Sequence, residues 1–188
     1  MRRTVFLDRD GVLNELVPDP RSGNCESPED PRDVALLPGA ADAVRRLRAE
    51  GYLVMVVSNQ PGAAKGQTSR EAVDAVHGAV VAALAADGAT VDAWRYCFHH
   101  PDAGDACGCR KPEPGLLLDA ARELDIDLGA SWMIGDSDTD VEAGRRAGVR
   151  TVLVLNPRSA HRRGRQAADL TVATLGEAAD GILDHASR

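Results

Sequence analysis

The sequence predicts an α/β protein built on a doubly wound, Rossmann-like parallel sheet. Its 188 residues alternate between short apolar segments typical of strands and amphipathic segments typical of helices. Residues 52–57 are almost continuously apolar, which is typical of a strand covered on both faces of a parallel sheet. Polar residues follow several strand-like segments directly, and ligands of such sheets bind outside the carboxyl ends of the strands. We therefore expect the functional site at that end of the sheet.

The first half of the chain contains four expected elements. They are a strand at residues 4–7, a helix at 38–50, a strand at 52–57 and a helix from about 68 to 87. Apolar residues recur at helical spacing in the two helices, at Ala40, Val44 and Leu47 and at Val73, Val76 and Val80. Thr68 is expected to cap the second helix, and Glu71 would complete a capping box.

The second half continues the alternation. We expect strands at 93–98, 132–134, 151–155 and, as a short edge strand, 169–172, with helices at 115–124, 138–147 and 175–184. Residues 15–37 are rich in Pro, Asp and Ser, and a loop of that length in a compact domain is often functional. Residues 156–168 form a basic segment, expected to be an exposed, mobile loop, with contact between Arg158–Arg165 and an anionic substrate as the alternative. No segment is large enough for a separate cap domain, so we expect one domain, 1–188, with an open site.

Composition and charge exclude several classes of protein. The formal net charge is −7 and aromatic residues make up 3%, which argues against nucleic-acid binding by a basic face or by stacking. No apolar run approaches the roughly 20 residues of a membrane span. The N-terminus lacks the apolar core of a signal peptide. We therefore expect a cytoplasmic monomer without a nucleic-acid or membrane partner.

The polar residues at the strand ends suit phosphoryl transfer. Asp8 could attack phosphorus and form an aspartyl-phosphate, while Asp10 could serve as general acid and base. Repulsion between Asp8 and a phosphate dianion requires a hard cation such as Mg²⁺, for which Asp8 and Asp136 are candidate ligands. Ser58 and Lys111 could bind the phosphoryl oxygens as their charge shifts.

Each of these residues also has a purely structural interpretation. Asp-x-Asp-Gly is a common turn sequence, Lys111 alone could be a solvated charge, and Asp136 could cap the helix that begins near Asp138. Asp140 fits the first turn of that helix, where its negative charge would interact favourably with the helix dipole. Alternatively, Asp140 could support the metal site. The combination, in this order on alternating strands, favours the chemical interpretation.

Four ordered motifs carry a resemblance to a known family. The segments "FLDRDGVLN", "SNQ", "CRKPEPG" and "IGDSDTD" resemble the four motifs of the haloacid dehalogenase superfamily, and they span Phe6 to Asp140. The likeness is to the branch that contains the heptose bisphosphate and histidinol phosphatases. An aspartate at position 10 resembles the phosphatases of the superfamily as opposed to its dehalogenases.

The resemblance implies a role for each motif residue. It makes Asp8 the nucleophile, Asp10 the acid and base, and Asp8, Asp136 and the backbone carbonyl of Asp10 the Mg²⁺ ligands. Ser58 and Lys111 would hold the phosphoryl group. The substrate contacts would come from Asn59, Arg110 and Lys65. The second motif continues as "PGAAKG" where the family usually has Ser-Gly and a basic residue, so Lys65 could meet a distal phosphate or be a solvated loop lysine.

Three of the four cysteines lie close together, in the segment Cys97-x-His99 and Cys107-x-Cys109. Three thiolates and an imidazole can form a tetrahedral zinc site of the structural kind, although free structural cysteines are the alternative and His100 could replace His99. The loop at about 97–109 runs directly into Arg110 and Lys111, as in the heptose bisphosphate branch. Zinc would then fix the loop that presents these cations to the substrate. Cys25 has no expected partner.

The sequence therefore predicts a Mg²⁺-dependent phosphomonoesterase with a structural zinc ion. The resemblance implies hydrolysis of the 7-phosphate of D-glycero-D-manno-heptose 1,7-bisphosphate, a small phosphorylated sugar. Histidinol phosphate, or another small sugar or polyol phosphate, is the alternative substrate. Two distant alternatives are a phospho-receiver domain and a zinc-ribbon interaction module. The receiver would place its phosphorylated aspartate after the third strand, where this chain has Cys-x-His, and the ribbon would need a second knuckle pair.

Overall fold

A six-stranded parallel sheet forms the centre of the computed structural model, which describes residues 1–100, 107–164 and 166–186. The strand order is β5-β4-β1-β6-β7-β8, with every neighbouring pair parallel. The strands are β1 Thr4–Leu7, β4 Leu53–Asn59, β5 Ala93–Cys97, β6 Trp132–Gly135, β7 Arg150–Val154 and β8 Leu170–Val172. This is the order of a doubly wound sheet whose direction of winding changes between β1 and β6, so the predicted fold class is confirmed.

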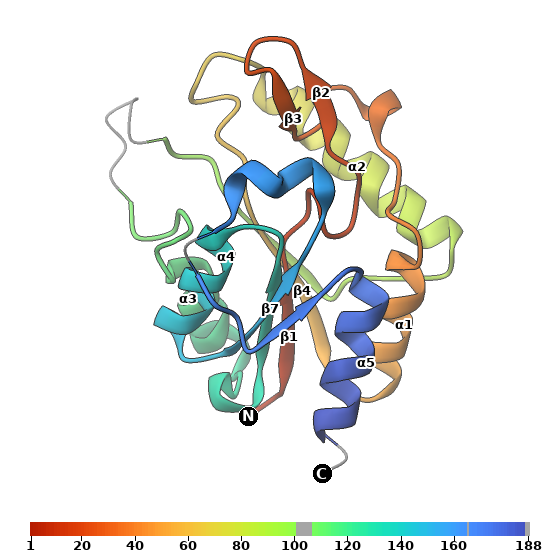
Figure 1. Cartoon of the computed structure of the whole chain (residues 1–188), viewed down its shortest axis with the longest axis vertical. Coiled ribbons are helices and arrows are strands. Elements are labelled where there is room, and N and C mark those ends of the chain that lie inside the picture. The colour runs from red at the N-terminus through yellow and green to blue at the C-terminus, as the bar shows by residue number, and fades with distance from the viewer. Residues whose placement is uncertain (101–106, 165, 187–188) are drawn as a thin grey trace.

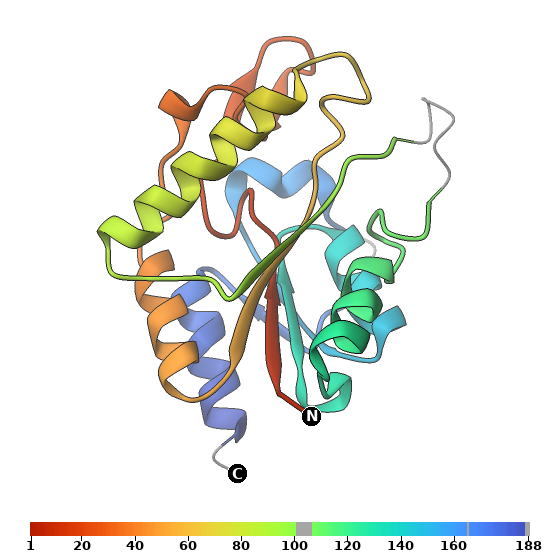
Figure 2. The same cartoon turned by 180° about the vertical axis from the view of Figure 1, so that it is seen from behind.

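Helices cover both faces of the sheet. Helices α1 (Ala40–Ala49) and α5 (Leu175–Ala186) pack together on one face, and α3 (Gly115–Leu124) and α4 (Asp138–Ala147) cover the other (Figure 1). Helix α2 (Arg70–Ala86) runs beside the upper end of the sheet, as the view from behind also shows (Figure 2). Successive side chains of β1 pack into two separate hydrophobic cores on opposite faces of the sheet: Val5 and Leu7 lie in one, and Phe6 lies in the other.

The helix starts differ slightly from the predictions. Helix α1 begins at Ala40, two residues later than expected. Ser69, and not Thr68, caps α2, because its backbone is extended and its hydroxyl oxygen accepts a hydrogen bond from the Ala72 amide at 3.1 Å. Two adjacent hydroxyl residues offer the same capping chemistry, so the sequence pattern does not distinguish them.

The long segment 15–37 contains a small hairpin. Strands β2 (Val17–Asp19) and β3 (Asn24–Glu26) pair antiparallel, and a short 3₁₀ helix, η1 (Pro31–Asp33), follows. The hairpin lies beyond the carboxyl ends of the central strands, near the start of α2 (Figure 1). Strands of three residues are too short to produce a recognisable alternation, which explains why only a loop was expected.

The basic segment after β7, expected to be an exposed, mobile loop, has exposed residues but also contains regular structure. Its first residues form a 3₁₀ helix, η4 (Pro157–Arg162); another, η3 (Leu128–Ala130), precedes β6. The Asn156 amide donates to the Gly11 carbonyl at 3.0 Å, and the Ser159 hydroxyl donates to the Asp136 carbonyl at 3.3 Å. These bonds attach the segment to the loops that follow β1 and β6. In the described part of the chain, no helix combines the length and apolarity required to cross a membrane.

Candidate active site

Two aspartates meet at the point where the sheet changes its direction of winding. Asp8 follows β1 and Asp136 follows β6, and these strands are neighbours with Leu7 paired to Ile134. The Asp8 amide donates to the Ile134 carbonyl at 2.9 Å. Gly11 is required here, because it has a φ of +86° and a Cβ at this position would lie 2.0 Å from Asp136 Oδ2. The two strand ends therefore bring two carboxylates together at the predicted site.

Asp8, Asp136 and Asp140 form a group that fits a hard cation. One carboxylate oxygen from each lies within 4.8 Å of the others. Asp136 is fully buried, and neither of its carboxylate oxygens accepts a hydrogen bond from a described residue. Burial, followed by the charges of Asp8 and Asp140, raises the pKa of Asp136 to about 7. A buried, unpaired carboxylate is costly, and an ion with oxygen ligands such as Mg²⁺ would stabilise it.

Lys111 places a buried ammonium group next to these carboxylates. Its Nζ lies 3.0 Å from Asp8 Oδ1 and 2.6 Å from Asp140 Oδ1, and it donates to the Val57 carbonyl at 2.8 Å. Burial alone would lower the pKa of Lys111, but the charges of Asp140 and Asp8 outweigh it and raise the pKa above its usual value. The ammonium group therefore stays charged beside the predicted nucleophile.

Asn59 holds the backbone of Lys111 in place. Its Oδ1 accepts a hydrogen bond from the Lys111 amide, and its Nδ2 donates to the Lys111 carbonyl, both at 3.0 Å. Asn59 was predicted to contact the substrate. It does line the cavity described below, but both ends of its amide are used to position Lys111.

Asp10 points into a cluster of hydrogen-bond donors and is not part of the carboxylate group around Asp136. Its Oδ1 accepts from Arg9 Nε at 3.0 Å and Asn14 Nδ2 at 2.9 Å. Its Oδ2 accepts from Gln60 Nε2 at 2.7 Å and Ser27 Oγ at 3.0 Å. Burial would raise the pKa of Asp10, but the Arg9 charge and these hydrogen bonds lower it below its usual value. The carboxyl group of Asp10 is thus in a different environment from that of Asp8.

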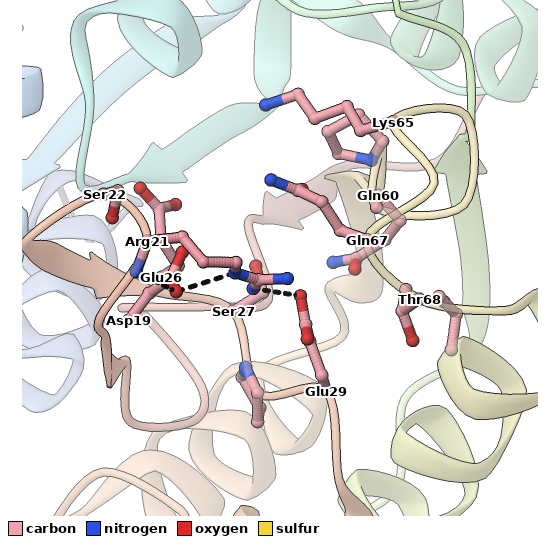
Figure 3. A pocket seen from close by; sticks show the side chains of 14 residues that line it. Asp19, Arg21, Ser22, Glu26, Ser27, Glu29, Gln60, Lys65, Gln67 and Thr68 are labelled. Carbon is pink, nitrogen blue, oxygen red and sulfur yellow. Dashed lines mark hydrogen bonds and ion pairs between the residues drawn. The ribbon is translucent and has the colours of Figure 1, made fainter.

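A cavity of about 340 Å³ opens onto these groups. Asp8, Asp10, Ser58 and Lys111 lie in its wall, and three further cations, Lys65, Arg110 and Arg162, line it from different loops. With Asn59, the cavity wall therefore contains every residue that was predicted to touch the substrate. A second cavity of about 140 Å³ adjoins it, and Glu26, Ser27, Pro61 and Lys65 line both (Figure 3).

The four predicted zinc ligands also come together. Cys109 Sγ lies 3.2 Å from Cys97 Sγ, 3.3 Å from Cys107 Sγ and 3.3 Å from His99 Nδ1. Such separations suit a tetrahedral zinc ion, whose bonds to sulfur of about 2.3 Å place the ligand atoms within 4 Å of one another. Cys25 is not part of this group. The middle of the predicted zinc loop, residues 101–106, lies outside the described residues.

Comparison with known proteins places the chain in a family. A model of HAD-hydrolase-like proteins matches residues 108–178. The D-glycero-beta-D-manno-heptose-1,7-bisphosphate 7-phosphatase of Rhodopseudomonas palustris is 40% identical, and the alignment covers 79% of this chain and 81% of that protein. The enzyme of the same name from Photorhabdus laumondii is 37% identical, and the alignment covers 92% of this chain and 91% of that protein. The chain belongs to the heptose-bisphosphate phosphatase family of HAD-like hydrolases. The predicted family is thus confirmed.

A solved structure of the heptose-bisphosphate phosphatase family has the same fold. The D,D-heptose 1,7-bisphosphate phosphatase of B. bronchiseptica, complexed with magnesium and phosphate, aligns with a TM-score of 0.82. It is 32% identical in sequence, and the alignment covers 97% of this chain and 99% of that one. The similarity therefore extends over the whole sheet, beyond the residues that the family model matches.

Three residues of the site were not assigned a role from the sequence. Gln60 ends the quoted "SNQ" motif, so its position at a strand end was a usable signal. Ser27 lies in the irregular segment 15–37 and Arg162 in the basic segment after β7; each segment is a possible functional loop by its sequence, but no signal singles out either residue within it. Arg162 reaches the cavity because its Nη2 donates to the Cys25 carbonyl at 3.1 Å and pairs with Glu26. Such contacts between distant segments depend on the fold.

Proposed function

We propose that this chain is a Mg²⁺-dependent phosphomonoesterase that removes the 7-phosphate of D-glycero-β-D-manno-heptose 1,7-bisphosphate through an aspartyl-phosphate on Asp8. The observation that carries the proposal is the position of Asp8. It lies at the wall of the cavity, 3.0 Å from a buried ammonium group and beside a buried, unpaired carboxylate. Family membership supports the substrate, since both curated relatives are named for the β anomer of this sugar.

The proposed metal ligands are Asp8, Asp136 and the backbone carbonyl of Asp10, with Asp140 close to the first two. Mg²⁺ bound there would supply positive charge to the phosphoryl oxygens and offset their repulsion by Asp8. The magnesium and phosphate bound to the B. bronchiseptica phosphatase support this assignment. The charge of the three acidic side chains exceeds that of Lys111, so a divalent cation also fits the local charge balance.

The residues of the chain can then carry the reaction in two steps. Asp8 Oδ1 is fixed by Lys111 at 3.0 Å and by the Arg9 amide at 2.8 Å, which leaves Oδ2 to attack phosphorus. As the bond from phosphorus to the sugar oxygen breaks, Asp10 in its protonated form, which the Arg9 charge disfavours in the free enzyme, donates its proton to that oxygen. Asp10 then accepts a proton from the water that attacks the aspartyl-phosphate, which releases inorganic phosphate and restores Asp8. Ser58 and Lys111 stabilise the phosphoryl oxygens in both steps.

A substrate with a second phosphate fits the cations around the cavity. Lys65, Arg110 and Arg162 line it in addition to Lys111; Arg162 is paired with Glu26, so positive charge from Lys65 and Arg110 remains for a group other than the phosphate that is hydrolysed. Histidinol phosphate, with one phosphate and a basic side chain, makes less use of these cations. It remains the second candidate because its phosphatases share the four sequence motifs.

The test is phosphate release with Mg²⁺ from both anomers of the heptose bisphosphate and from histidinol phosphate at matched concentrations. We expect kcat/KM for the β anomer to exceed that for histidinol phosphate by at least about 100-fold, or about 2.7 kcal/mol of transition-state stabilisation. A preference for histidinol phosphate would contradict the proposed substrate while leaving the catalytic residues unchanged.

We further propose a structural zinc ion held by Cys97, His99, Cys107 and Cys109. Its support is the grouping of these four ligand atoms at the end of β5, next to Arg110, whose Nη1 donates to the His99 carbonyl at 3.2 Å. Thiolate ligands require reduced cysteines, which supports the cytoplasm as the compartment. The sequence supports a single domain and a monomer.

Metal analysis is expected to find about one zinc ion per chain. Cys109→Ser should lose most of the zinc and weaken substrate binding, because Arg110 would no longer be held by the loop. Cys25→Ser is the matched control: it removes a thiol outside the cluster, so zinc content should stay at the wild-type level. A wild-type protein that is stable and fully active without zinc would contradict this role.

A further inference from the structure

Two segments distant in sequence control one side of the Asp10 carboxylate. The donors to Oδ1, Arg9 and Asn14, belong to the same loop as Asp10 itself. Arg9 Nη2 also pairs with Oδ2 at 3.0 Å, but the two hydrogen-bond donors to Oδ2 come from elsewhere: Gln60 follows β4, and Ser27 follows β3. The orientation of Oδ2 therefore depends on how the β4 loop and the hairpin segment are placed.

Gln60 is itself held rigidly. It is 5% exposed, and its backbone amide donates to the Cys97 carbonyl at 2.7 Å. Its side-chain Nε2 lies 2.7 Å from Asp10 Oδ2 and 3.1 Å from Ser58 Oγ. One amide group thus connects the proposed acid and base with the proposed phosphoryl-binding hydroxyl.

Gln60 and Ser27 also line the second cavity (Figure 3). That cavity has little net positive charge to offer, because Arg21 is paired with Asp19 at 2.8 Å and with Glu29 at 2.6 Å, and Lys65 shares the wall with Glu26. Gln67, Thr68 and Ser22 add amide and hydroxyl groups to the wall, and Pro28, Pro61 and Val73 add apolar surface. Its volume of about 140 Å³ equals that of roughly five water molecules. These properties suit a short hydroxylated chain better than a phosphate or an apolar group.

We propose that Gln60 is a positioning residue for Asp10, and that hydroxyl groups of the substrate in the second cavity act on Asp10 through Gln60 and Ser27. This inference rests on the proposed function, because it assigns the second cavity to the hydroxylated part of the sugar. A substrate that fills the cavity holds Gln60 against Oδ2 and so fixes the side of Asp10 that exchanges protons with the sugar oxygen.

The test compares two substrates that differ in their need for an acid. The heptose bisphosphate has a poor leaving group that requires protonation, whereas p-nitrophenyl phosphate releases a stable phenolate that requires little. Gln60→Glu keeps the shape of the side chain but removes the Nε2 donor, and Gln60→Met removes all hydrogen bonding. We expect both variants to lower kcat for the heptose bisphosphate by at least about 30-fold, as for a misplaced general acid. Turnover of p-nitrophenyl phosphate should change by less than about 3-fold.

Gln166→Ala is the matched control, because Gln166 lines neither cavity and accepts a hydrogen bond from Arg145 Nη1 at 3.2 Å. It should leave kcat and KM unchanged for both substrates. Equal losses on both substrates in the Gln60 variants would indicate a merely structural role and overturn the proposal, as would unchanged kcat on both. Thermal melting reports whether each variant folds. If the Gln60 variants do not fold, Ser27→Ala removes the other donor to Oδ2 and must show the same selective loss.

Failure of the proposed function would give a different result. Wild-type protein would then hydrolyse p-nitrophenyl phosphate but neither heptose bisphosphate anomer. In that case glycerol phosphate, another poor leaving group with hydroxyl groups, replaces the sugar in the comparison. Selective loss on glycerol phosphate would support the role of Gln60 independently, and its absence would overturn it.

Discussion

Asp8→Asn is expected to lower phosphate release at least about 10,000-fold, because the amide cannot attack phosphorus. The fold should be retained. Burial, followed by the charges of Asp140 and Asp10, raises the pKa of Asp8 against the opposing effect of Lys111, so its ionised form is costly without metal. A neutral side chain also removes repulsion with Asp136 and Asp140. Phosphate release and the melting temperature in Mg²⁺-free buffer measure the two effects.

Asp8→Glu is the matched control for this variant. This variant keeps the negative charge but moves the carboxylate oxygens by about the length of one methylene group. Activity should again be lost, because the oxygens are misplaced for attack on phosphorus. The melting temperature of Asp8→Asn without Mg²⁺ should equal or exceed that of the wild type. Activity above about 1% of wild type in Asp8→Asn would exclude Asp8 as the nucleophile.

Lys111→Met is expected to lower both stability and activity. Lys111 is buried and is the cation closest to Asp8 and Asp140, at 3.0 Å and 2.6 Å. Removing one partner of a buried ion pair leaves the other charge unpaired and typically costs about 3 to 5 kcal/mol. We expect a loss of that size in the free energy of unfolding, measured by urea in Mg²⁺-free buffer, together with loss of turnover.

Arg146→Met provides the matched surface control. Arg146 pairs with Glu113 at 2.6 Å and Glu142 at 2.8 Å, but its side chain is 42% exposed, so its loss should cost less than about 1 kcal/mol. Combining Asp8→Asn with Lys111→Met should cost less than the sum of the two single changes, because the carboxylate left unpaired by the second is removed by the first. Equal costs for Lys111→Met and Arg146→Met would contradict the buried charge network.

The sequence predicts which polar residues meet at the strand ends, because parallel strands place their carboxyl ends at one edge of the sheet. The adjacency of Asp8 and Asp136 follows from that rule once β1 and β6 are neighbours. The zinc ligands are predictable for another reason. In Cys97-x-His99 and in Cys107-x-Cys109 only one residue separates the two ligands, so the members of each pair must lie close together. Lys111 was predicted beside the phosphoryl group; the structure places it against Asp8 and Asp140, and its contact with a phosphoryl group stays a prediction.

Contacts between distant segments could not be predicted in this way. The Ser159 hydroxyl bonds the Asp136 carbonyl, and this contact holds a segment that local pattern describes only as basic. Ser27 reaches Asp10 because the hairpin turns back over the sheet, and three-residue strands give no recognisable period. The resemblance implies that Asn59 contacts the substrate; that its amide also binds the backbone of Lys111 is visible only in the fold. Each case depends on which segments the tertiary fold brings together.

The most direct test of the central claim is to trap the phosphoryl group on Asp8. In Asp10→Asn, the first step with p-nitrophenyl phosphate needs little acid, whereas hydrolysis of the aspartyl-phosphate lacks its base. We predict a burst of about one p-nitrophenolate per chain followed by slow turnover, and an acid-stable phosphate on the peptide that contains Asp8. Slow release without a burst, or a phosphate attached to any other residue, would contradict catalysis through Asp8.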